Sequence, residues 1–243
     1  MIGLYYKAND CRSENCIEIL KKSLSDNSLA YKVICEGSPD SGNDDIDVMI
    51  VFGGDGTVLR ASKIAGSKIP IVGINTGSLG FLSSYESDDV FTLVEDILSG
   101  TLTFSERRFM SVKVNDKEFF ALNDAVITKN HLVDNVSECI KLYLKIDGQF
   151  VDAYVGDGLI LSTPTGSTAY AISAGGPIMV PDVNAYVVAP ICAHTLHSKP
   201  IVYPQKSLAE VKVLSNSKEC ALFIDGKMEA CLKPETIVKI TAS

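Results

Sequence analysis

Hydrophobic positions follow two different periods along the chain, and the change falls near residue 102. Before it, short continuous apolar runs such as residues 48–52 (VMIVF) and 69–74 (IPIVGI) alternate with segments whose apolar side chains recur at helical spacing. One helical segment carries Cys16, Leu20 and Leu24, and we expect Ser13 to cap it. Apolar strands that alternate with helices are typical of a parallel sheet buried on both faces. Residues 1–101 are therefore predicted to form a Rossmann-like α/β domain.

After residue 102 the apolar period becomes two, as in residues 140–146 (IKLYLKI), which are followed by an Asp147-Gly148 hairpin signal. Residues 108–114 and 118–127 are predicted to be strands on either side of an Asn115-Asp116 turn. We expect residues 102–243 to form an antiparallel all-β domain, whose last roughly 20 residues could return to the first domain. No low-complexity linker separates the halves, so a ligand site in a cleft between two closely packed domains is expected.

The charge balance narrows the class of partner. Lys and Arg number 22 against 30 Asp and Glu, which gives a net charge of 22 − 30 = −8. A protein that works on a nucleic-acid backbone usually presents a basic face, so no nucleic-acid partner is expected. A nucleotide ligand is still possible, because backbone N–H groups and a metal ion can hold its phosphates.

The cysteines and the apolar stretches indicate the compartment. Seven cysteines occur without a C-x-x-C pair, and an odd number cannot all form internal disulfides. No stretch has the length and polarity of a signal segment or a membrane-spanning helix. We therefore expect a reduced, cytoplasmic protein that has no membrane partner.

A glycine-rich loop, GGDGT at residues 53–57, follows the apolar run at 48–52. Its glycines let the backbone approach a phosphate, and the helix that follows offers N–H groups and a favourable dipole. The spacing is neither the P-loop nor the G-x-G-x-x-G dinucleotide pattern. Asp55 should repel an anion there, so it either has a chemical task or caps the helix in a tight strand–helix turn.

The next apolar run ends in a similar loop, NTGSLGF at residues 75–81. Loops at the carboxyl ends of neighbouring parallel strands line one crevice, which is where open α/β sheets bind ligands. Two such loops favour a nucleotide or a sugar phosphate.

Two further segments carry polar residues where a strand is expected. Residues 156–177 (GDGLILSTPTGSTAYAISAGGP) run from an apolar strand into hydroxyls and glycines around Tyr170. This segment is either an ordinary polar loop or a surface that stacks a base and binds ribose or phosphate. Asn123-Asp124 interrupts the strand-like FFALNDAVIT, as an edge feature or as a ligand contact.

Four segments taken together resemble the NAD kinase family. They are GGDGTVLR (53–60), NTGSLGFL (75–82), the Asn123-Asp124 pair and DGLILSTPTGSTAYAISAGGPI (157–178), and ICAHTLHSKPIV (191–202) and FIDG (223–226) continue the match. The resemblance implies transfer of the γ-phosphoryl of ATP, or of polyphosphate, to the 2′-hydroxyl of the adenosine ribose of NAD, giving NADP. It also implies a divalent metal, usually Mg²⁺, that is not fixed by protein side chains alone, and a homodimer or homotetramer.

The resemblance also implies roles for individual residues. Asp55 would be the general base toward the 2′-hydroxyl, and Asp157 would meet the nicotinamide amide. The phosphate and ATP loop would consist of Gly53, Gly54, Gly56 and Thr57. The NAD-binding set would consist of Asp55, Gly56, Arg60, Phe81, Asn123, Asp124, Asp157, Thr168, Ala169, Tyr170 and Ser173.

Asp124 stands where the family usually has glutamate, which we expect to change the affinity for NAD and not to abolish activity. Two alternatives remain: a lipid or sugar kinase that shares the GGDGT loop, and a non-catalytic NAD(P)-binding sensor that kept the fold.

Overall fold

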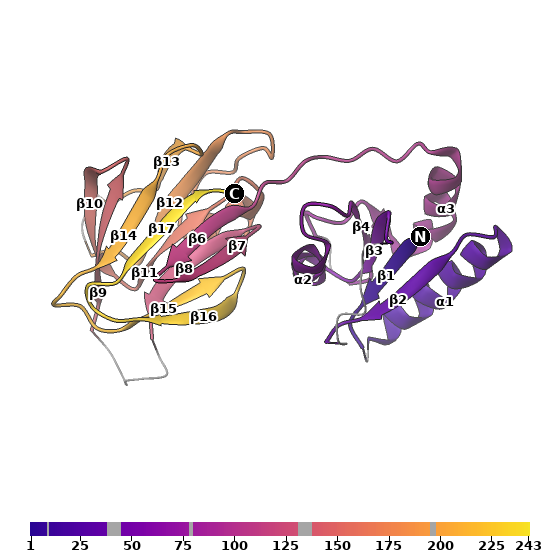
Figure 1. Ribbon diagram of the computed structural model, residues 1–243, viewed down its shortest axis with the longest axis horizontal. Helices are drawn as coiled ribbons and strands as arrows, with labels where there is room; N and C mark the ends of the chain where they lie inside the picture. The colour runs from indigo at the N-terminus through magenta and orange to yellow at the C-terminus, as the bar shows by residue number, and fades with distance from the viewer. Residues whose placement is uncertain (9, 38–44, 78–79, 131–137, 195–197) are drawn as a thin grey trace. The chain divides into compact units, whose positions relative to one another are not determined.

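The computed structural model describes residues 1–8, 10–37, 45–77, 80–130, 138–194 and 198–243 (Figure 1). The chain forms two compact units, residues 1–105 and 106–243. No helix in the described part of the chain is long and apolar enough to cross a bilayer.

The first unit is built on a five-stranded parallel sheet with the order β2-β1-β3-β4-β5. The strands are β1 (Ile2–Tyr6), β2 (Tyr31–Cys35), β3 (Val48–Phe52), β4 (Ile71–Asn75) and β5 (Tyr85–Glu86). The chain runs outward from β1 to β2 and then returns to the other side of β1 as β3. The strand order therefore reverses between β1 and β3, which is the switch point where open α/β sheets bind ligands.

Helices cover both faces of this sheet. They are α1 (Cys11–Asp26), α2 (Asp55–Ala65), the 3₁₀ turn η1 (Ser87–Asp89) and α3 (Val90–Ser99). Leu20 of α1 and Leu93 of α3 are fully buried in one apolar cluster, and Val58 and Ala61 of α2 belong to a second cluster. The predicted parallel α/β sheet is confirmed, although the sequence analysis did not identify β2.

The prediction that Ser13 caps the first helix is wrong. The cap of α1 is Asp10, whose carboxylate accepts the N–H of Arg12 at 3.3 Å. Both residue types are good caps, and the three-residue difference places Ser13 inside the first turn. There Ser13 is fully buried and bonds to the hydroxyl of Thr76 at 2.9 Å, which ties α1 to the loop after β4.

The second unit consists of two six-stranded sheets, ordered β10-β9-β14-β17-β6-β7 and β13-β12-β11-β8-β15-β16, in which all strand pairs are antiparallel. The first sheet contains β6 (Met110–Val114), β7 (Lys117–Ala121), β9 (Ile140–Ile146), β10 (Gln149–Gly156), β14 (Ala209–Val213) and β17 (Ile237–Ala242). The second contains β8 (Asp124–Lys129), β11 (Gly158–Ser162), β12 (Ala185–Ile191), β13 (Ile201–Pro204), β15 (Cys220–Ile224) and β16 (Lys227–Leu232). The predicted antiparallel domain is confirmed, and β16 and β17 at its end pair inside this unit.

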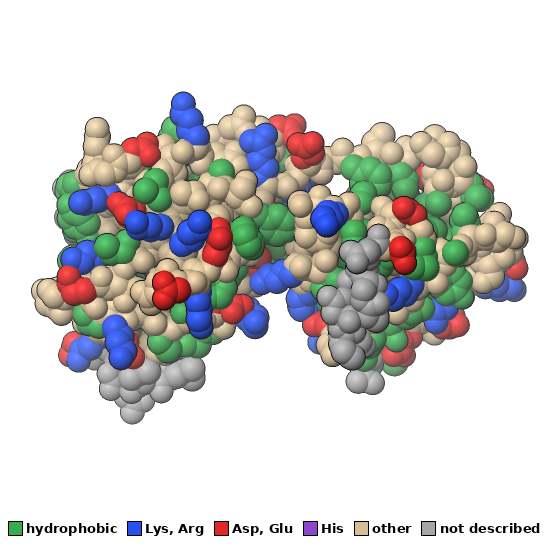
Figure 2. All heavy atoms as spheres, in the orientation of Figure 1, with side chains coloured by type: hydrophobic (Ala, Val, Ile, Leu, Met, Phe, Trp, Pro, Cys, Tyr) green, Lys and Arg blue, Asp and Glu red, His purple; other side chains and the backbone are tan. Residues whose placement is uncertain are grey.

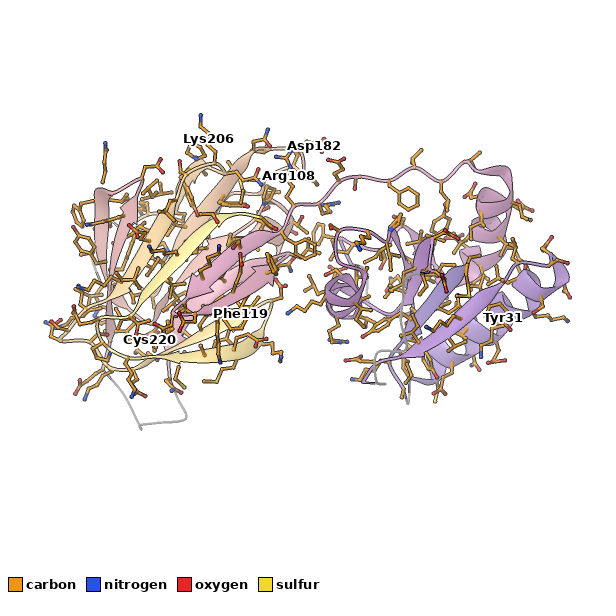
Figure 3. All side chains as sticks on the ribbon, in the orientation of Figure 1. Tyr31, Arg108, Phe119, Asp182, Lys206 and Cys220 are labelled. Carbon is orange, nitrogen blue, oxygen red and sulfur yellow. The ribbon has the colours of Figure 1, made fainter. Side chains whose placement is uncertain are left out.

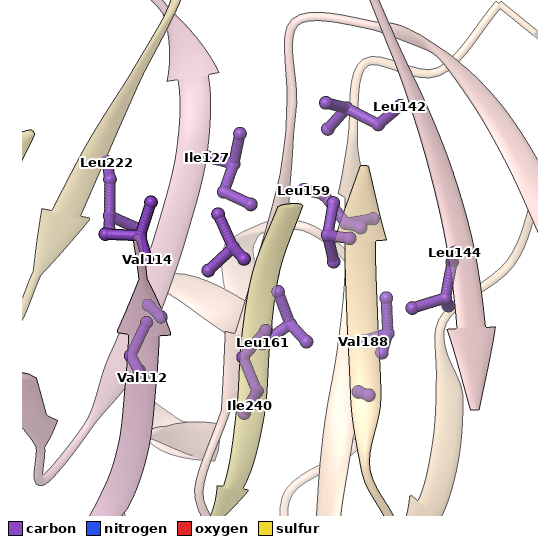
Figure 4. Close-up of a cluster of buried hydrophobic side chains, with 14 of the residues drawn as sticks. Val112, Val114, Ile127, Leu142, Leu144, Leu159, Leu161, Val188, Leu222 and Ile240 are labelled. Carbon is purple, nitrogen blue, oxygen red and sulfur yellow. The ribbon is translucent and has the colours of Figure 1, made fainter. Parts of the chain in front are cut away.

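The main core of this unit lies between the two sheets (Figure 4). Alternate residues of each strand point into it, such as Leu142 and Leu144 from one sheet and Leu159 and Leu161 from the other. Burial of each such side chain is worth about 1.5–3 kcal/mol. Arg108, labelled in Figure 3, precedes β6 and donates hydrogen bonds to the side chains of Asn184 and Gln205.

The outer face of the second sheet is covered by the segment that follows β11. This segment contains the 3₁₀ turn η2 (Thr165–Thr168) and the short helix α4 (Tyr170–Ser173). Ala171 and Met179 from this segment pack with Ile160 and Val187 on that face. β11 is therefore covered on both faces of the sheet, which explains why all of its residues are buried, the polar Ser162 included.

The prediction of one strand over residues 118–127 is also wrong. The run is divided into β7 and β8, which belong to different sheets, and Leu122 and Asn123 make the crossing. The apolar character continues because both strands line the same core. The polar pair Asn123-Asp124 therefore marks the place where the chain passes from one sheet to the other.

Candidate active site

The carboxyl ends of β1, β3 and β4 open on a cavity of about 440 Å³ in the first unit. It is lined by Lys7, Asp10, Cys11, Arg12, Gly53, Gly54, Thr57, Thr76 and Gly77. The cavity thus lies at the switch point of the sheet, and both predicted glycine loops contribute to it.

The lining of this cavity suits an anion. Helix α1 begins at Cys11 and helix α2 at Asp55, so both direct unpaired N–H groups and the positive end of a dipole toward it. Lys7 and Arg12 add two cationic side chains. Sequence analysis missed both, although their positions directly after the first strand and beside the first helix cap were a usable signal.

One residue of the glycine loop, Gly53, has the positive φ angle that a glycine-rich sequence predicts. Gly53 has φ = +147°, and a Cβ there would lie 2.4 Å from the Thr57 hydroxyl oxygen. Only glycine fits this bend without displacing Thr57, which is buried at the start of α2.

Asp55 does not cap the helix. The cap residue of α2 is Gly54, and no side chain forms the capping hydrogen bond. The Asp55 carboxylate instead accepts the backbone N–H of Phe81 at 2.9 Å and of Leu82 at 3.0 Å. A Cβ on Gly80 would come within 2.2 Å of one of its oxygens. Asp55 therefore joins the loop after β3 to the loop after β4.

Two other predicted residues lie in the same unit. Arg60 forms an ion pair with Glu36 (Nε–Oε1 2.6 Å) and donates to the Thr57 hydroxyl at 3.2 Å. Phe81 has 71% of its surface exposed, so its ring is available for contact with a ligand. Ser78 and Leu79 of the second loop lie outside the described residues.

In the second unit, the Asn123-Asp124 turn is held closely by the segment after β11. The Asn123 carbonyl accepts the N–H of Thr163 at 2.9 Å. A Cβ on Gly166 would lie 2.1 Å from that carbonyl oxygen, so the two backbones are in direct contact. Residues 157–178 are therefore more than a polar loop, because part of the segment is packed against this turn.

The side chains of Asn123 and Asp124 are both buried, and burial has a different consequence for each. The Oδ1 atom of Asn123 has no hydrogen-bond partner among the residues that the structure describes. Burial, with a further contribution from the nearby charge of Asp225, raises the pKa of Asp124 to about 7. A buried acceptor without a partner and a carboxyl group that titrates near neutrality are both features of ligand sites.

Asp157 forms an ion pair with Lys129 of β8, with Nζ and Oδ1 2.5 Å apart. The hydrogen bond from Lys129 holds the pKa of Asp157 below its usual value, and the same bond raises the pKa of Lys129. The sequence did not point to this ion pair, because Lys129 and Asp157 are 28 positions apart in the chain and meet only in the folded sheet.

The remaining predicted residues lie from the end of η2 through α4. Thr168 and Ala169 are half-buried, whereas Tyr170 and Ser173 on α4 are exposed. Tyr170 has 47% of its surface exposed although Ala171, the next residue, is fully buried in the sheet face below. The helix is therefore anchored while its tyrosine ring is available to stack on a base.

Charged side chains elsewhere are mixed in sign. On the face shown in Figure 2, Lys and Arg side chains are interspersed with Asp and Glu. Among the described residues, no group of three or more His, Cys, Asp or Glu side chains is arranged to hold a metal ion.

A glycine loop at the switch point of a parallel sheet and a β-sandwich with buried polar groups define a nucleotide-phosphate-binding protein. Comparisons with known proteins identify its family. The ATP-NAD kinase N-terminal domain matches residues 6–102, and the ATP-NAD kinase C-terminal domain matches residues 122–243.

Curated relatives agree with these matches. The NAD kinase of Syntrophobacter fumaroxidans is 41% identical over 205 residues, covering 82% of this chain and 71% of the relative. The NAD kinase of Fusobacterium nucleatum is 34% identical over 231 residues, covering 95% and 85%. This chain belongs to the NAD kinase family, and it is a phosphotransferase, as the resemblance predicts.

Solved structures show the same fold. An NAD kinase from Archaeoglobus fulgidus, crystallised in complex with ATP, superimposes with a TM-score of 0.80 at 25% identity over 100% of this chain and 90% of that one. A yeast NADH kinase complexed with NADH gives a TM-score of 0.84 at 23% identity, over 100% and 80%. The match to the C-terminal domain of NAD kinases does not favour the lipid or sugar kinase alternative.

Proposed function

We propose that this enzyme transfers the γ-phosphoryl of ATP, or of polyphosphate, to the 2′-hydroxyl of the adenosine ribose of NAD, giving NADP. The observation that carries the proposal is the cavity at the switch point, on which two helix N-termini open directly beside the Asp55 loop. Such a cavity suits a chain of phosphates.

The phosphoryl donor is assigned to this cavity. Backbone N–H groups of Gly54 and Gly56 would stabilise the charge that spreads over the transferring phosphoryl. The N–H groups of Gly53 and Thr57 donate instead to the carbonyls of Ile74 and Gly54, so these two residues would hold the loop in shape. Lys7 and Arg12 would add positive charge along the donor, and they suit polyphosphate as well as ATP because neither recognises a base.

Asp55 is assigned as the general base toward the 2′-hydroxyl. The N–H groups of Phe81 and Leu82 fix the carboxylate in one orientation. Each carboxylate oxygen can accept more than one hydrogen bond, so capacity remains for the proton of the hydroxyl.

NAD is assigned to the residues that the family resemblance implies. Asn123 and Asp124 would bind the adenosine part through the buried groups described above, and Asp157 would meet the nicotinamide amide. The rest of the proposed NAD-binding set is at least partly exposed and so could contact the dinucleotide. These residues are Gly56, Arg60, Phe81, Thr168, Ala169, Tyr170 and Ser173.

Mg²⁺ is the proposed cofactor. Asp10 and Thr57 are among the residues that line the cavity, so one carboxylate and one hydroxyl would be close to the ion. This sparse oxygen set fits Mg²⁺, which retains waters and binds through one or two carboxylates together with substrate phosphates. When bound, the ion would neutralise phosphate charge that Asp55 would otherwise repel.

We also propose a cytoplasmic homodimer or homotetramer. Exposed apolar side chains on the second unit, such as Ile178, Val180 and Val202, support an association surface. Light scattering on the purified protein tests this, and a monomer at all concentrations would contradict it.

The reaction is tested by incubating the protein with NAD, ATP and Mg²⁺ and detecting NADP with an NADP-specific dehydrogenase. Parallel reactions contain polyphosphate in place of ATP, EDTA in place of Mg²⁺, or the Asp55→Asn variant. NADP should form with wild type and Mg²⁺, and formation should fall by about 10²–10⁴-fold in Asp55→Asn, as expected for loss of a general base. NAD binding without NADP from either donor would instead support the sensor alternative.

A further inference from the structure

A carboxylate outside the predicted site holds the Asn123-Asp124 turn in place. Asp225 lies in the hairpin turn between β15 and β16. Its Oδ2 accepts the N–H of Leu122 at 3.1 Å, and its Oδ1 accepts those of Asn123 at 2.8 Å and Asp124 at 3.2 Å. Three consecutive backbone N–H groups therefore converge on a single side chain.

The backbone of Asp225 takes part as well. Its N–H donates to the Asp124 carbonyl at 3.0 Å, so the two turns are bonded in both directions. On the other side, Thr163 donates its N–H to the Asn123 carbonyl and its hydroxyl to the Leu122 carbonyl. Asp225 therefore binds the three N–H groups and the Asp124 carbonyl, and Thr163 binds the carbonyls of Leu122 and Asn123.

We propose that Asp225 is a positioning residue for NAD recognition: its carboxylate fixes the turn that presents the side chains of Asn123 and Asp124 to the dinucleotide. This inference rests on the proposal that those two side chains bind NAD. Asp225 need not touch the substrate, because it acts through the backbone of the turn.

The residue type fits this role for two reasons. Charge-assisted hydrogen bonds from backbone N–H groups to a carboxylate are roughly twice as strong as neutral ones, and both carboxylate oxygens are used. Asp225 also has φ = +48° and is followed by Gly226 at φ = +79°, a turn that Asp, Asn or Gly accepts readily.

The arrangement carries an electrostatic consequence. Asp124 is flanked by β11, where its partner is Ser162, and by β15, which leads into Asp225. Ser162 does not titrate, so Asp225 is the charged group that faces Asp124 from these strands. Its charge adds to burial in raising the pKa of Asp124.

The chain offers a matched control. Asp147 occupies the same place in the β9–β10 hairpin, with φ = +50°, is followed by Gly148 and accepts the N–H of Leu208 at 2.9 Å. It lies outside the proposed site. The same two substitutions are therefore made at each position: Asp225→Asn and Asp225→Gly, with Asp147→Asn and Asp147→Gly as controls. Asn and Gly both tolerate the positive φ, so the hairpins should form.

The measurements are the dissociation constant of NAD by calorimetry, the KM for NAD and for ATP, kcat, and thermal unfolding. Asp225→Gly should weaken NAD binding by about 10- to 100-fold, as expected for a misplaced binding group. The KM for ATP and kcat should change by less than about threefold. Asp225→Asn keeps one acceptor oxygen and should show a smaller loss, and both Asp147 variants should bind NAD as wild type does.

The pH dependence of NAD binding gives a readout that loss of stability alone would not move. In Asp225→Asn the charge beside Asp124 is gone, so the transition assigned to Asp124 should shift to lower pH than in wild type. Unchanged NAD affinity in Asp225→Gly, or equal losses in the Asp147 variants, would overturn the inference. Asn123→Ala separates the two proposals: if it leaves NAD affinity unchanged, the assignment of the site itself fails.

Discussion

In both units an aspartate carboxylate holds a site loop by accepting backbone N–H groups, but the two carboxylates have different proposed roles. In the first unit the Asp55 carboxylate collects the N–H groups of Phe81 and Leu82. In the second, the Asp225 carboxylate collects three N–H groups of the Asn123-Asp124 turn. Asp55 is also the proposed reactive group, whereas Asp225 is the proposed support for side chains that are assigned to NAD binding.

This difference determines what a substitution can report. A substitution at Asp55 removes the proposed general base and also breaks the hydrogen bonds that join the two loops. One such substitution therefore cannot show how much of the lost activity is due to each. In the second unit, support and recognition reside in different residues and can be removed one at a time. Steric changes at neighbouring glycines extend this comparison to both loops.

The largest effect is expected for Gly166→Ala. The new Cβ would lie 2.1 Å from the backbone carbonyl oxygen of Asn123, and backbone on both sides leaves little freedom to yield. We expect a loss of about 1–3 kcal/mol of stability together with severe loss of NAD binding. Chemical unfolding and calorimetry measure the two, and wild-type values for both would show that the turn is not held as described.

Gly80→Ala should act on chemistry and leave the fold intact. Its Cβ would meet an Asp55 oxygen at 2.2 Å, and a side chain can move away where backbone cannot. We expect kcat to fall by about 100-fold as the base is displaced. NAD affinity should fall as well, because Asp55 also belongs to the proposed NAD-binding set, whereas the unfolding temperature should stay near wild type. A kcat equal to that of wild type would show that catalysis does not depend on the orientation of the Asp55 carboxylate.

Asp124→Asn should lower the affinity for NAD and raise the stability of the folded protein, and the gain in stability should depend on pH. The folded-state pKa of Asp124 is raised to about 7 by burial and by Asp225, while an unfolded Asp titrates near pH 3.9. Between these values the folded chain holds a proton that the unfolded chain has released, so wild-type stability falls as pH rises through this window.

The asparagine variant lacks that loss, so its stability advantage over wild type should grow from pH 4 to pH 7 and then level off. Thermal unfolding across this range measures the difference. NAD affinity should fall in the same variant, because the buried carboxyl group is replaced. A constant difference in stability at every pH would contradict the raised pKa.

Tyr170→Ala should have the smallest effect. The ring is 47% exposed and the helix is anchored by Ala171, so stability should change little. Loss of one base–aromatic stack costs about 1–3 kcal/mol. For a ring that is half exposed we expect the lower part of this range, about 1.4 kcal/mol, which corresponds to about a tenfold higher KM for NAD. Steady-state kinetics with NAD and with ATP test this. A higher KM for ATP alone would indicate that the ring contacts ATP and not NAD.

Features of the fold that depend on a local signal could be predicted from the sequence. The run VMIVF coincides with β3, and the glycine loop after it lies at the switch point because strand, turn and helix are contiguous. Features that depend on a contact between residues distant in sequence could not be predicted. The break between β7 and β8 was hidden because both strands line one core. Asp225 could not be identified as a support, since its three N–H partners are about a hundred residues away.

The most direct test compares kcat for Asp55→Asn and Asp225→Asn at saturating NAD and ATP. Both substitutions remove one charge from a carboxylate that binds backbone N–H groups. The account predicts that kcat falls by at least about 100-fold in Asp55→Asn and by less than about threefold in Asp225→Asn, whose defect appears in the KM for NAD. Equal losses of kcat in the two variants would contradict the distinction between a reacting carboxylate and a positioning one.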